Sequence, residues 1–232
     1  MDIVLVPGLW LNASSWDAVV PHLEGAGHRV TAVELPGMES RAADRSHITL
    51  DDHVGAVAAA IDAAEEPVVV VGHSAGSGIV SAAVDARPDK VARAIYVGGF
   101  PSSDGDPLLN GFDAVGGEVP LPDLSDFSED DLKDFDEAAK ASFRERAIPS
   151  PAQVVHGIVH LGDERRWDVP VTAICPEYSA ADLQSWIEGG EPSVQEFARI
   201  KDVTYVDLPT GHWPQFTKPA ELARLILAQP PL

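Results

Sequence analysis

The sequence predicts an α/β fold in which six mostly parallel strands form a doubly wound sheet. Short, wholly apolar segments recur along the chain, as in strands that are covered on both faces. Segments with helical periodicity or helical start signals separate them, and such crossovers join parallel strands. The alternation stops once, after the fourth strand, and it resumes before the fifth. We therefore expect one domain over residues 1–232, with a small helical cap inserted at about 102–167.

The first four expected strands are separated by three helices. In order, these elements are Ile3–Val6, a helix at Ser15–Gly25, Arg29–Leu35, a helix at Thr49–Ala64, Val68–Val71, a helix from Ser77 to Ala86, and Ala92–Val97. The first helix carries Trp16, Val19 and Leu23 on one face, which indicates helical periodicity. Thr49 is a suitable N-cap for the second helix. Pro-Gly or Gly-Gly pairs follow the first, second and fourth strands and mark turns there.

The insertion begins as a loop and is expected to continue as two helices. Residues 101–118 are rich in glycine, aspartate and proline. Ser128–Arg146 is predicted to be a helix, because Ser128 and Asp131 suit a capping box. Its apolar stripe consists of Leu132, Phe135, Ala139 and Phe143. A second helix is expected from Ser150-Pro151 toward His160, since proline is tolerated in the first helical turn.

Strand and helix alternate again after the insertion. The expected elements are a strand at Val169–Cys175, helices at Ala181–Ile187 and Ser193–Arg199, a strand at Val203–Leu208 and a helix at Pro219–Ala228.

The composition excludes several classes of function. The formal net charge is −21, so the surface repels phosphate backbones and anionic lipids, and we expect neither nucleic-acid nor membrane binding. Between Ser102 and Ala147 there are 13 acidic and 4 basic residues, a net charge of −9. A solvated acidic surface is the favoured explanation, and attraction of a cationic substrate is the alternative. The single cysteine, Cys175, and the absence of a signal-peptide pattern predict a cytoplasmic protein.

The most informative motif is Gly72-His73-Ser74-Ala75-Gly76. It follows the apolar run Pro67–Val71 and opens a segment of small residues, which predicts a strand, a sharp turn and a helix. A serine at such a turn projects its hydroxyl from the top of the sheet. The flanking glycines suit a turn that brings backbone close to backbone, where a Cβ atom would clash.

This motif, the order of elements and the late segment Gly211-His212-Trp213-Pro214 together resemble the α/β-hydrolase fold. The opening Val4-Leu5-Val6-Pro7-Gly8-Leu9-Trp10 is similar to that of the small, cap-bearing esterase branch, which includes plant methyl esterases and hydroxynitrile lyases. Two features depart from the family pattern. Pro7 stands where a histidine is usual, and the first two strands of the family are missing.

The resemblance implies a serine nucleophile, a histidine base and an acid. Ser74 and His212 match the family's nucleophile and base, and backbone N–H groups of Leu9 and Ala75 would form the oxyanion hole. Trp10 and Trp213 are expected to contact the substrate. The acid stays open, because Ser179 occupies its usual place; Glu177 is favoured, and Asp104, Asp182 and no acid at all are alternatives.

The resulting expectation is a serine hydrolase that cleaves a small or medium carboxylic ester or lactone. We expect no cofactor and no metal, and the sequence is compatible with a homodimer. Two alternatives remain: a lyase or cyclase on the same scaffold, and a non-enzymatic receptor for a small molecule.

Overall fold

Six parallel strands form the central sheet, in the order β2-β1-β3-β4-β7-β8. The computed structural model describes residues 1–65 and 67–228. The strands are β1 (Asp2–Val6), β2 (Arg29–Ala32), β3 (Val68–His73), β4 (Val91–Val97), β7 (Val171–Cys175) and β8 (Val203–Asp207). This arrangement confirms the predicted doubly wound parallel sheet.

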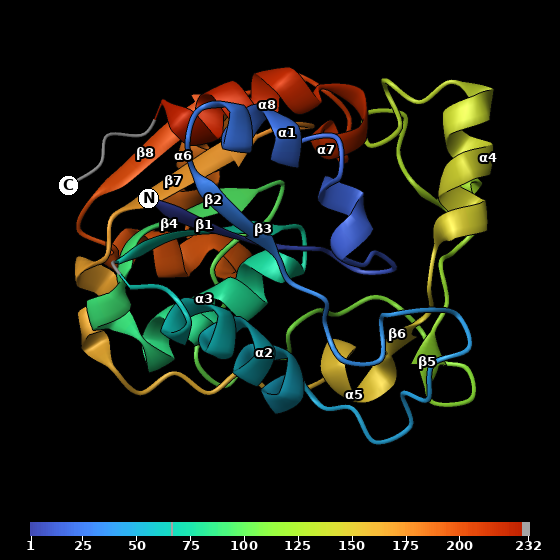
Figure 1. Ribbon diagram of the computed structural model, residues 1–232, viewed down its shortest axis with the longest axis horizontal. Coiled ribbons are helices and arrows are strands. Elements are labelled where there is room, and N and C mark those ends of the chain that lie inside the picture. The colour runs from blue at the N-terminus through green and yellow to red at the C-terminus, as the bar shows by residue number, and fades with distance from the viewer. Residues whose placement is uncertain (66, 229–232) are drawn as a thin grey trace.

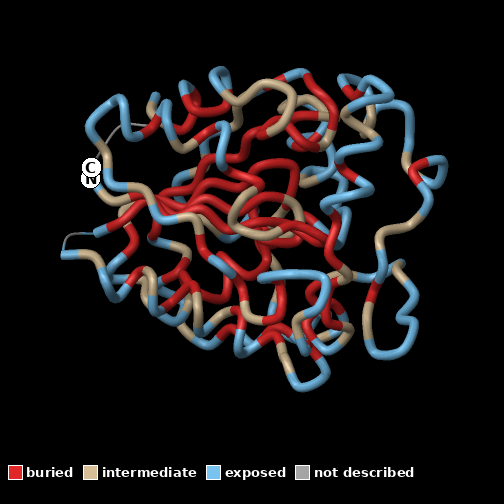
Figure 2. Tube along the Cα trace, turned by 45° about the vertical axis from the view of Figure 1, so that its right-hand side comes forward, coloured by how far each residue is buried: buried red, intermediate tan, exposed pale blue. Residues whose placement is uncertain are grey.

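Helices cover both faces of the sheet (Figure 1). One face carries α1 (Val20–Gly25) and α8 (Pro219–Leu227), and the other carries α2 (Leu50–Asp62), α3 (Gly76–Ala86) and α6 (Ala180–Glu188). The strand sequence sets this division, because successive side chains of a strand point to opposite faces. In β3, Val68 and Val70 enter one core cluster, whereas Val69 and Val71 enter the other. Figure 2 shows the resulting buried strands between exposed outer segments.

The segment between β4 and β7 lies at the carboxyl end of the sheet, opposite the N-terminus (Figure 1). It contains β5 (Glu118–Val119), α4 (Glu137–Arg146), β6 (Ser150–Pro151) and α5 (Ala152–Val155). The strands β5 and β6 pair in an antiparallel two-stranded sheet, which the sequence pattern did not predict. The carboxyl ends of parallel strands are where α/β proteins bind ligands, so this segment lies beside the expected site.

The helix expected at Ser128–Arg146 begins only at Glu137. The capping-box bonds do form: the Ser128 N–H donates to Asp131 Oδ2 at 2.9 Å, and the Asp131 N–H donates to Ser128 Oγ at 3.1 Å. The chain then leaves the helical path, because the Asp131 carbonyl accepts from the His212 N–H at 2.8 Å. Asp136 caps the shorter helix instead.

The first expected helix is also divided. A 3₁₀ helix spans Ala13–Trp16, and α1 begins at Val20. Pro21 lies in the first turn of α1, where its missing N–H is tolerated, but it would interrupt a continuous helix that started at Ser15.

Other boundaries differ by smaller amounts. The segment Pro192–Arg199 is a 3₁₀ helix, and a short helix α7 (Pro214–Thr217) precedes α8. The helix expected to reach His160 ends at Val155. In the described part of the chain, no helix has both the length and the apolar character that crossing a membrane requires.

Candidate active site

The turn between β3 and α3 holds Ser74 in a left-handed backbone conformation, with φ of 53°. Such a conformation is costly for a residue with a Cβ atom and persists only where its surroundings enforce it. The Ser74 N–H donates to the Val97 carbonyl of β4 at 2.9 Å, which anchors the turn. A Cβ atom on Gly72 would lie 2.6 Å from the Gly76 carbonyl oxygen, and one on Gly76 would lie 2.5 Å from the Pro7 carbonyl oxygen. The glycines of the motif are therefore needed for close backbone packing.

The side chains of His212 and Glu177 are hydrogen-bonded. His212 follows β8 and Glu177 follows β7, so two neighbouring parallel strands bring them to the same edge of the sheet. His212 Nδ1 and Glu177 Oε1 lie 2.7 Å apart, and the two side chains are only 18% and 16% exposed. The other carboxylate oxygen, Glu177 Oε2, is buried and has no partner among the described residues. Glu177 is thus directed at the imidazole ring.

The other two candidate carboxylates are engaged elsewhere. Asp104 Oδ1 accepts from the Leu161 N–H at 2.8 Å. Asp182 accepts from the N–H and the hydroxyl of Ser179 and completes the capping box of α6. Of the three candidates, only Glu177 contacts His212 in the described structure.

The buried side chain of His73 connects the serine turn to the His212 loop. Its Nδ1 accepts from the Gln215 amide at 3.2 Å, so its Nε2 carries the proton and donates to the His212 carbonyl at 2.7 Å. Burial, followed by the proximity of His212, lowers the pKa of His73 to about 3. His73 is therefore neutral and holds the two loops in register.

Asp131 joins this site from the segment between β4 and β7. One carboxylate oxygen of Asp131, one of Glu177 and one ring nitrogen of His212 all lie within 4.8 Å of one another. These three residues could hold a metal ion, although Glu177 and His212 already bond to each other. The sequence does not indicate Asp131 as a site residue, because the local capping signal predicts a helix there. Its approach to His212 depends on a contact across 81 positions of the chain.

The turn after β1 packs directly against Ser74. A Cβ atom on Gly8 would lie 2.9 Å from His73 Nδ1 and 3.0 Å from Ser74 Cβ. Among the hydrogen bonds of the described residues, none uses the backbone N–H of Leu9 or of Ala75. The Trp10 N–H, in contrast, donates to Ser150 Oγ at 3.0 Å. The N–H groups of Leu9 and Ala75 are therefore among the donors of this turn and of the α3 N-terminus that have no acceptor in the described structure.

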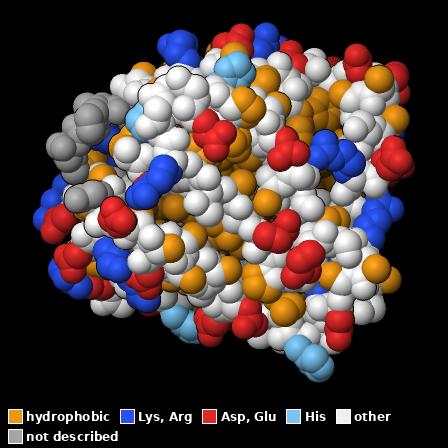
Figure 3. Space-filling view, in the orientation of Figure 1, with side chains coloured by type: hydrophobic (Ala, Val, Ile, Leu, Met, Phe, Trp, Pro, Cys, Tyr) orange, Lys and Arg blue, Asp and Glu red, His pale blue; other side chains and the backbone are white. Residues whose placement is uncertain are grey.

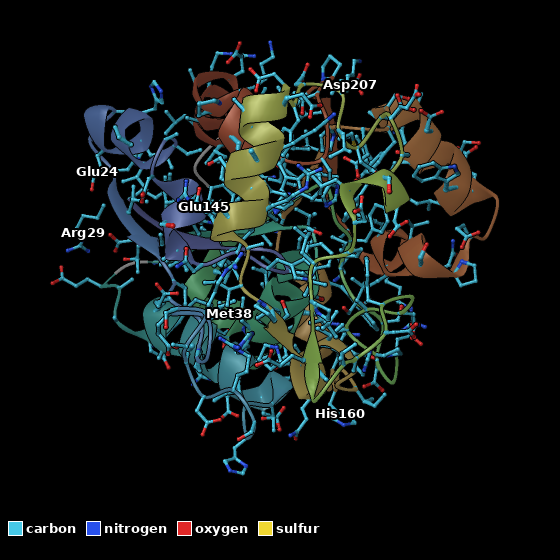
Figure 4. The ribbon with its side chains drawn as sticks, turned by 90° about the vertical axis from the view of Figure 1, so that its right-hand side faces the viewer. Glu24, Arg29, Met38, Glu145, His160 and Asp207 are labelled. Carbon is cyan, nitrogen blue, oxygen red and sulfur yellow. The ribbon has the colours of Figure 1, made fainter. Side chains whose placement is uncertain are left out.

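A cavity of about 790 Å³ opens above these residues. Ser74, His212 and Glu177 line it, as do Leu9 and Ala75. Figure 4 looks onto this end of the molecule, with α4 and its Glu145 toward the viewer and His160 at the lower edge.

The two tryptophans expected to contact substrate also line the cavity, and both are almost fully buried. The Trp10 indole donates to the Val119 carbonyl at 3.2 Å. Trp213 is the centre of an aromatic cluster, in which the Phe143 ring lies 4.8 Å and the Phe135 ring 5.5 Å away. Each therefore supports the cavity wall by packing.

Curated relatives of similar sequence are esterases. Methylesterase 7 of Arabidopsis thaliana is 29% identical over 256 residues, which cover 97% of this chain and 94% of the relative. A carbendazim hydrolyzing esterase of a Nocardioides species is 25% identical over 251 residues, 98% of each chain.

Solved structures share the fold. An extracellular α/β-hydrolase from a Paenibacillus species, described as sharing structural and functional homology with tobacco salicylic acid binding protein 2, has a TM-score of 0.80 at 20% identity. The match covers 98% of both chains. The sequence profile of the alpha/beta hydrolase family matches residues 3–225. The chain therefore belongs to the alpha/beta hydrolase family, as an ester hydrolase of the α/β fold.

Proposed function

We propose that this ester hydrolase cleaves a small or medium carboxylic ester, or a lactone, with Ser74 as nucleophile, His212 as base and Glu177 as acid. The observation that carries the proposal is the 2.7 Å hydrogen bond between His212 and Glu177, in the same cavity as a serine with a strained backbone. The names of the relatives, a methylesterase and a carbendazim hydrolyzing esterase, support ester cleavage.

The reaction follows from the roles of these groups. Ser74 Oγ attacks the ester carbonyl while His212 Nε2 accepts the hydroxyl proton. The His212 Nδ1–H donates to Glu177, which fixes the tautomer that leaves Nε2 free as a base. The oxyanion of the tetrahedral intermediate accepts from the N–H groups of Leu9 and Ala75. His212 then protonates the leaving alcohol, and it next activates the water that cleaves the acyl-enzyme.

The segment 102–167 would act as a cap over the cavity. Phe112, Phe127 and Asp131 from this segment line the cavity. A volume of about 790 Å³ lies in the usual range of small-molecule pockets, roughly 300–1,000 Å³, which favours a medium-sized ester. The single, buried Cys175 supports a reducing, cytoplasmic location.

Labelling with a fluorophosphonate tests the nucleophile. We expect one adduct per chain, and peptide mapping should place it on Ser74. The wild-type protein should hydrolyse p-nitrophenyl acetate or butyrate, and Ser74→Ala should lose both the activity and the label. Ser103→Ala is a matched control, because Ser103 lines the same cavity outside the proposed triad. An active Ser74→Ala variant, or an adduct on another residue, would contradict the mechanism.

A further inference from the structure

The wall of the active-site cavity is negatively charged. Four carboxylates line it: Asp106, Asp131, Glu177 and Glu191. None of the described residues that line the cavity is a lysine or an arginine. Figure 3 shows acidic side chains spread among hydrophobic ones over one face of the molecule. The negative charge of this protein therefore extends into the site itself.

These carboxylates are not neutralised by nearby basic residues. Within the described ranges, no ion pair includes Asp106, Asp131 or Glu191, and Glu177 pairs only with His212. Among the described residues, the Asp131 carboxylate accepts hydrogen bonds from Ser128 alone, which is neutral. Elsewhere, acidic residues such as Asp62 have basic partners. An anionic group bound in this cavity would meet several like charges, and among the described residues of the cavity wall it would find no lysine or arginine.

An exposed tryptophan lies at the rim of the cavity, and its backbone is bonded to that of one of these acidic residues. The Trp186 side chain is 38% exposed and lines the cavity. Of the four large exposed hydrophobic side chains in the described structure, it alone does so. Glu191 also lines the cavity, and its N–H donates to the Trp186 carbonyl at 3.0 Å. The Glu191 carboxylate has no basic partner among the described residues and accepts only a 3.5 Å hydrogen bond from the neutral Ser193 hydroxyl. An aromatic ring and a carboxylate on one cavity wall can together attract an alkylammonium group, through cation–π and Coulomb interactions.

The aromatic surface continues from the rim into the cavity. The ring of Tyr178 lies 5.3 Å from that of Trp186, and the ring of Phe100 lies 5.6 Å from that of Tyr178. All three residues line the cavity. A substrate that enters past Trp186 therefore meets π faces along this wall.

We propose that this enzyme prefers esters that carry an alkylammonium group, which Trp186 and Glu191 bind at the rim while the ester carbonyl lies at Ser74. The inference rests on the proposed ester hydrolysis and adds its substrate class. The same wall disfavours anionic esters. It also favours release of the product, because the acid formed by hydrolysis ionises to a carboxylate.

A pair of isosteric substrates tests this preference. Butyrylcholine and 3,3-dimethylbutyl butyrate have the same acyl group and shape, but only the first carries a positive charge. For the wild-type protein we expect kcat/KM to be about 10-fold higher for butyrylcholine, since each rim contact contributes about 2- to 5-fold. Because exposed charges are screened, 0.5 M NaCl should reduce this ratio.

Variants at the rim locate the effect. Trp186→Leu and Glu191→Gln should each lower the ratio of the two kcat/KM values about 2- to 5-fold. Glu188→Gln is the matched control, because Glu188 lies exposed on α6 and does not line the cavity. It should leave the ratio at the wild-type value.

Binding of the two alcohol products provides a readout that does not depend on turnover. By calorimetry, choline should bind several-fold more tightly than 3,3-dimethylbutan-1-ol, and Glu191→Gln should reduce this difference about 2- to 5-fold. The proposal is overturned if the wild-type ratio of kcat/KM for butyrylcholine to that for the neutral ester is 1 or less, or if both rim variants leave this ratio unchanged. In either case, hydrolysis of the neutral ester would still support the proposed esterase function. A wild-type protein that hydrolyses neither ester and is not labelled at Ser74 would instead reject the proposed function. Choline binding would then test the rim site independently of catalysis.

Discussion

Replacing Glu177 by Gln removes one negative charge beside the His212 ring and keeps the length of the side chain. In the reaction, His212 becomes positively charged after it takes the serine proton, and Glu177 stabilises that charge. Opposite unit charges about 4 Å apart near a protein surface attract by about 4 kcal/mol. This value applies to the pair of His212 and Glu177, because their bonded atoms are 2.7 Å apart and each side chain is less than one-fifth exposed. We therefore expect Glu177→Gln to lower kcat/KM by about 10³-fold.

The loss increases if the new amide rotates. Its NH₂ group would then donate to Nδ1 and leave the proton on Nε2, so the ring could not accept from Ser74. A wrong tautomer of this kind lowers turnover by about 10⁴-fold. Both losses arise because the wild-type side chain is a negatively charged carboxylate, which can only accept a hydrogen bond from His212 Nδ1.

The assay is hydrolysis of p-nitrophenyl butyrate at neutral pH, with the rate of fluorophosphonate labelling as a second readout. Asp104→Asn and Asp182→Asn are the matched controls, because each makes the same kind of change at a carboxylate that bonds elsewhere. Both should keep kcat/KM within a few-fold of the wild-type value. Circular dichroism and a thermal melt establish that each variant is folded.

Two results would refute this reasoning. The first is a folded Glu177→Gln variant that retains more than one-tenth of the wild-type kcat/KM. The second is an equal loss in Asp104→Asn. The second result would assign the acid to the strand after the serine turn and would leave Ser74 and His212 in place.

Three further expectations concern the surroundings of the triad. Gly8→Ala should lower activity strongly, because its Cβ atom would lie 2.9 Å from His73 Nδ1. Gly55→Ala should keep full activity, because a Cβ atom there would have no neighbour within 4 Å. Equal activities of the two variants would contradict the close packing at Gly8. The pKa of His73 is about 3 in the fold and about 6.5 in the unfolded chain. As the pH falls from 7 to 5, only the unfolded state therefore gains a proton on this side chain. This uptake lowers the free energy of unfolding by about 2 kcal/mol. Urea unfolding of wild type and His73→Asn at both pH values measures this term, and an identical pH dependence would disprove it. Burial, together with the negative charges of Asp207 and Glu177, raises the pKa of the Cys175 thiol to about 12, so a disulfide reagent should label it only after unfolding; rapid labelling of the native protein at pH 8 would show otherwise.

Short-range patterns in the sequence predicted the sheet and the serine turn. A short apolar segment becomes a buried strand whichever strands lie beside it. The turn at Ser74 needs only the glycines of its own motif and the adjacent strand and helix. For the same reason, the predicted strand Val68–Val71 and the observed β3 (Val68–His73) begin at the same residue.

Contacts between distant parts of the chain decided the remainder. The sequence left three carboxylates open for the acid, because Glu177 and His212 are 35 positions apart and only the pairing of β7 with β8 brings them together. The predicted capping bonds between Ser128 and Asp131 do form, yet the helix begins only at Glu137. There, the His212 N–H takes the Asp131 carbonyl that a helix would have used, and a local pattern contains no information about such a competitor.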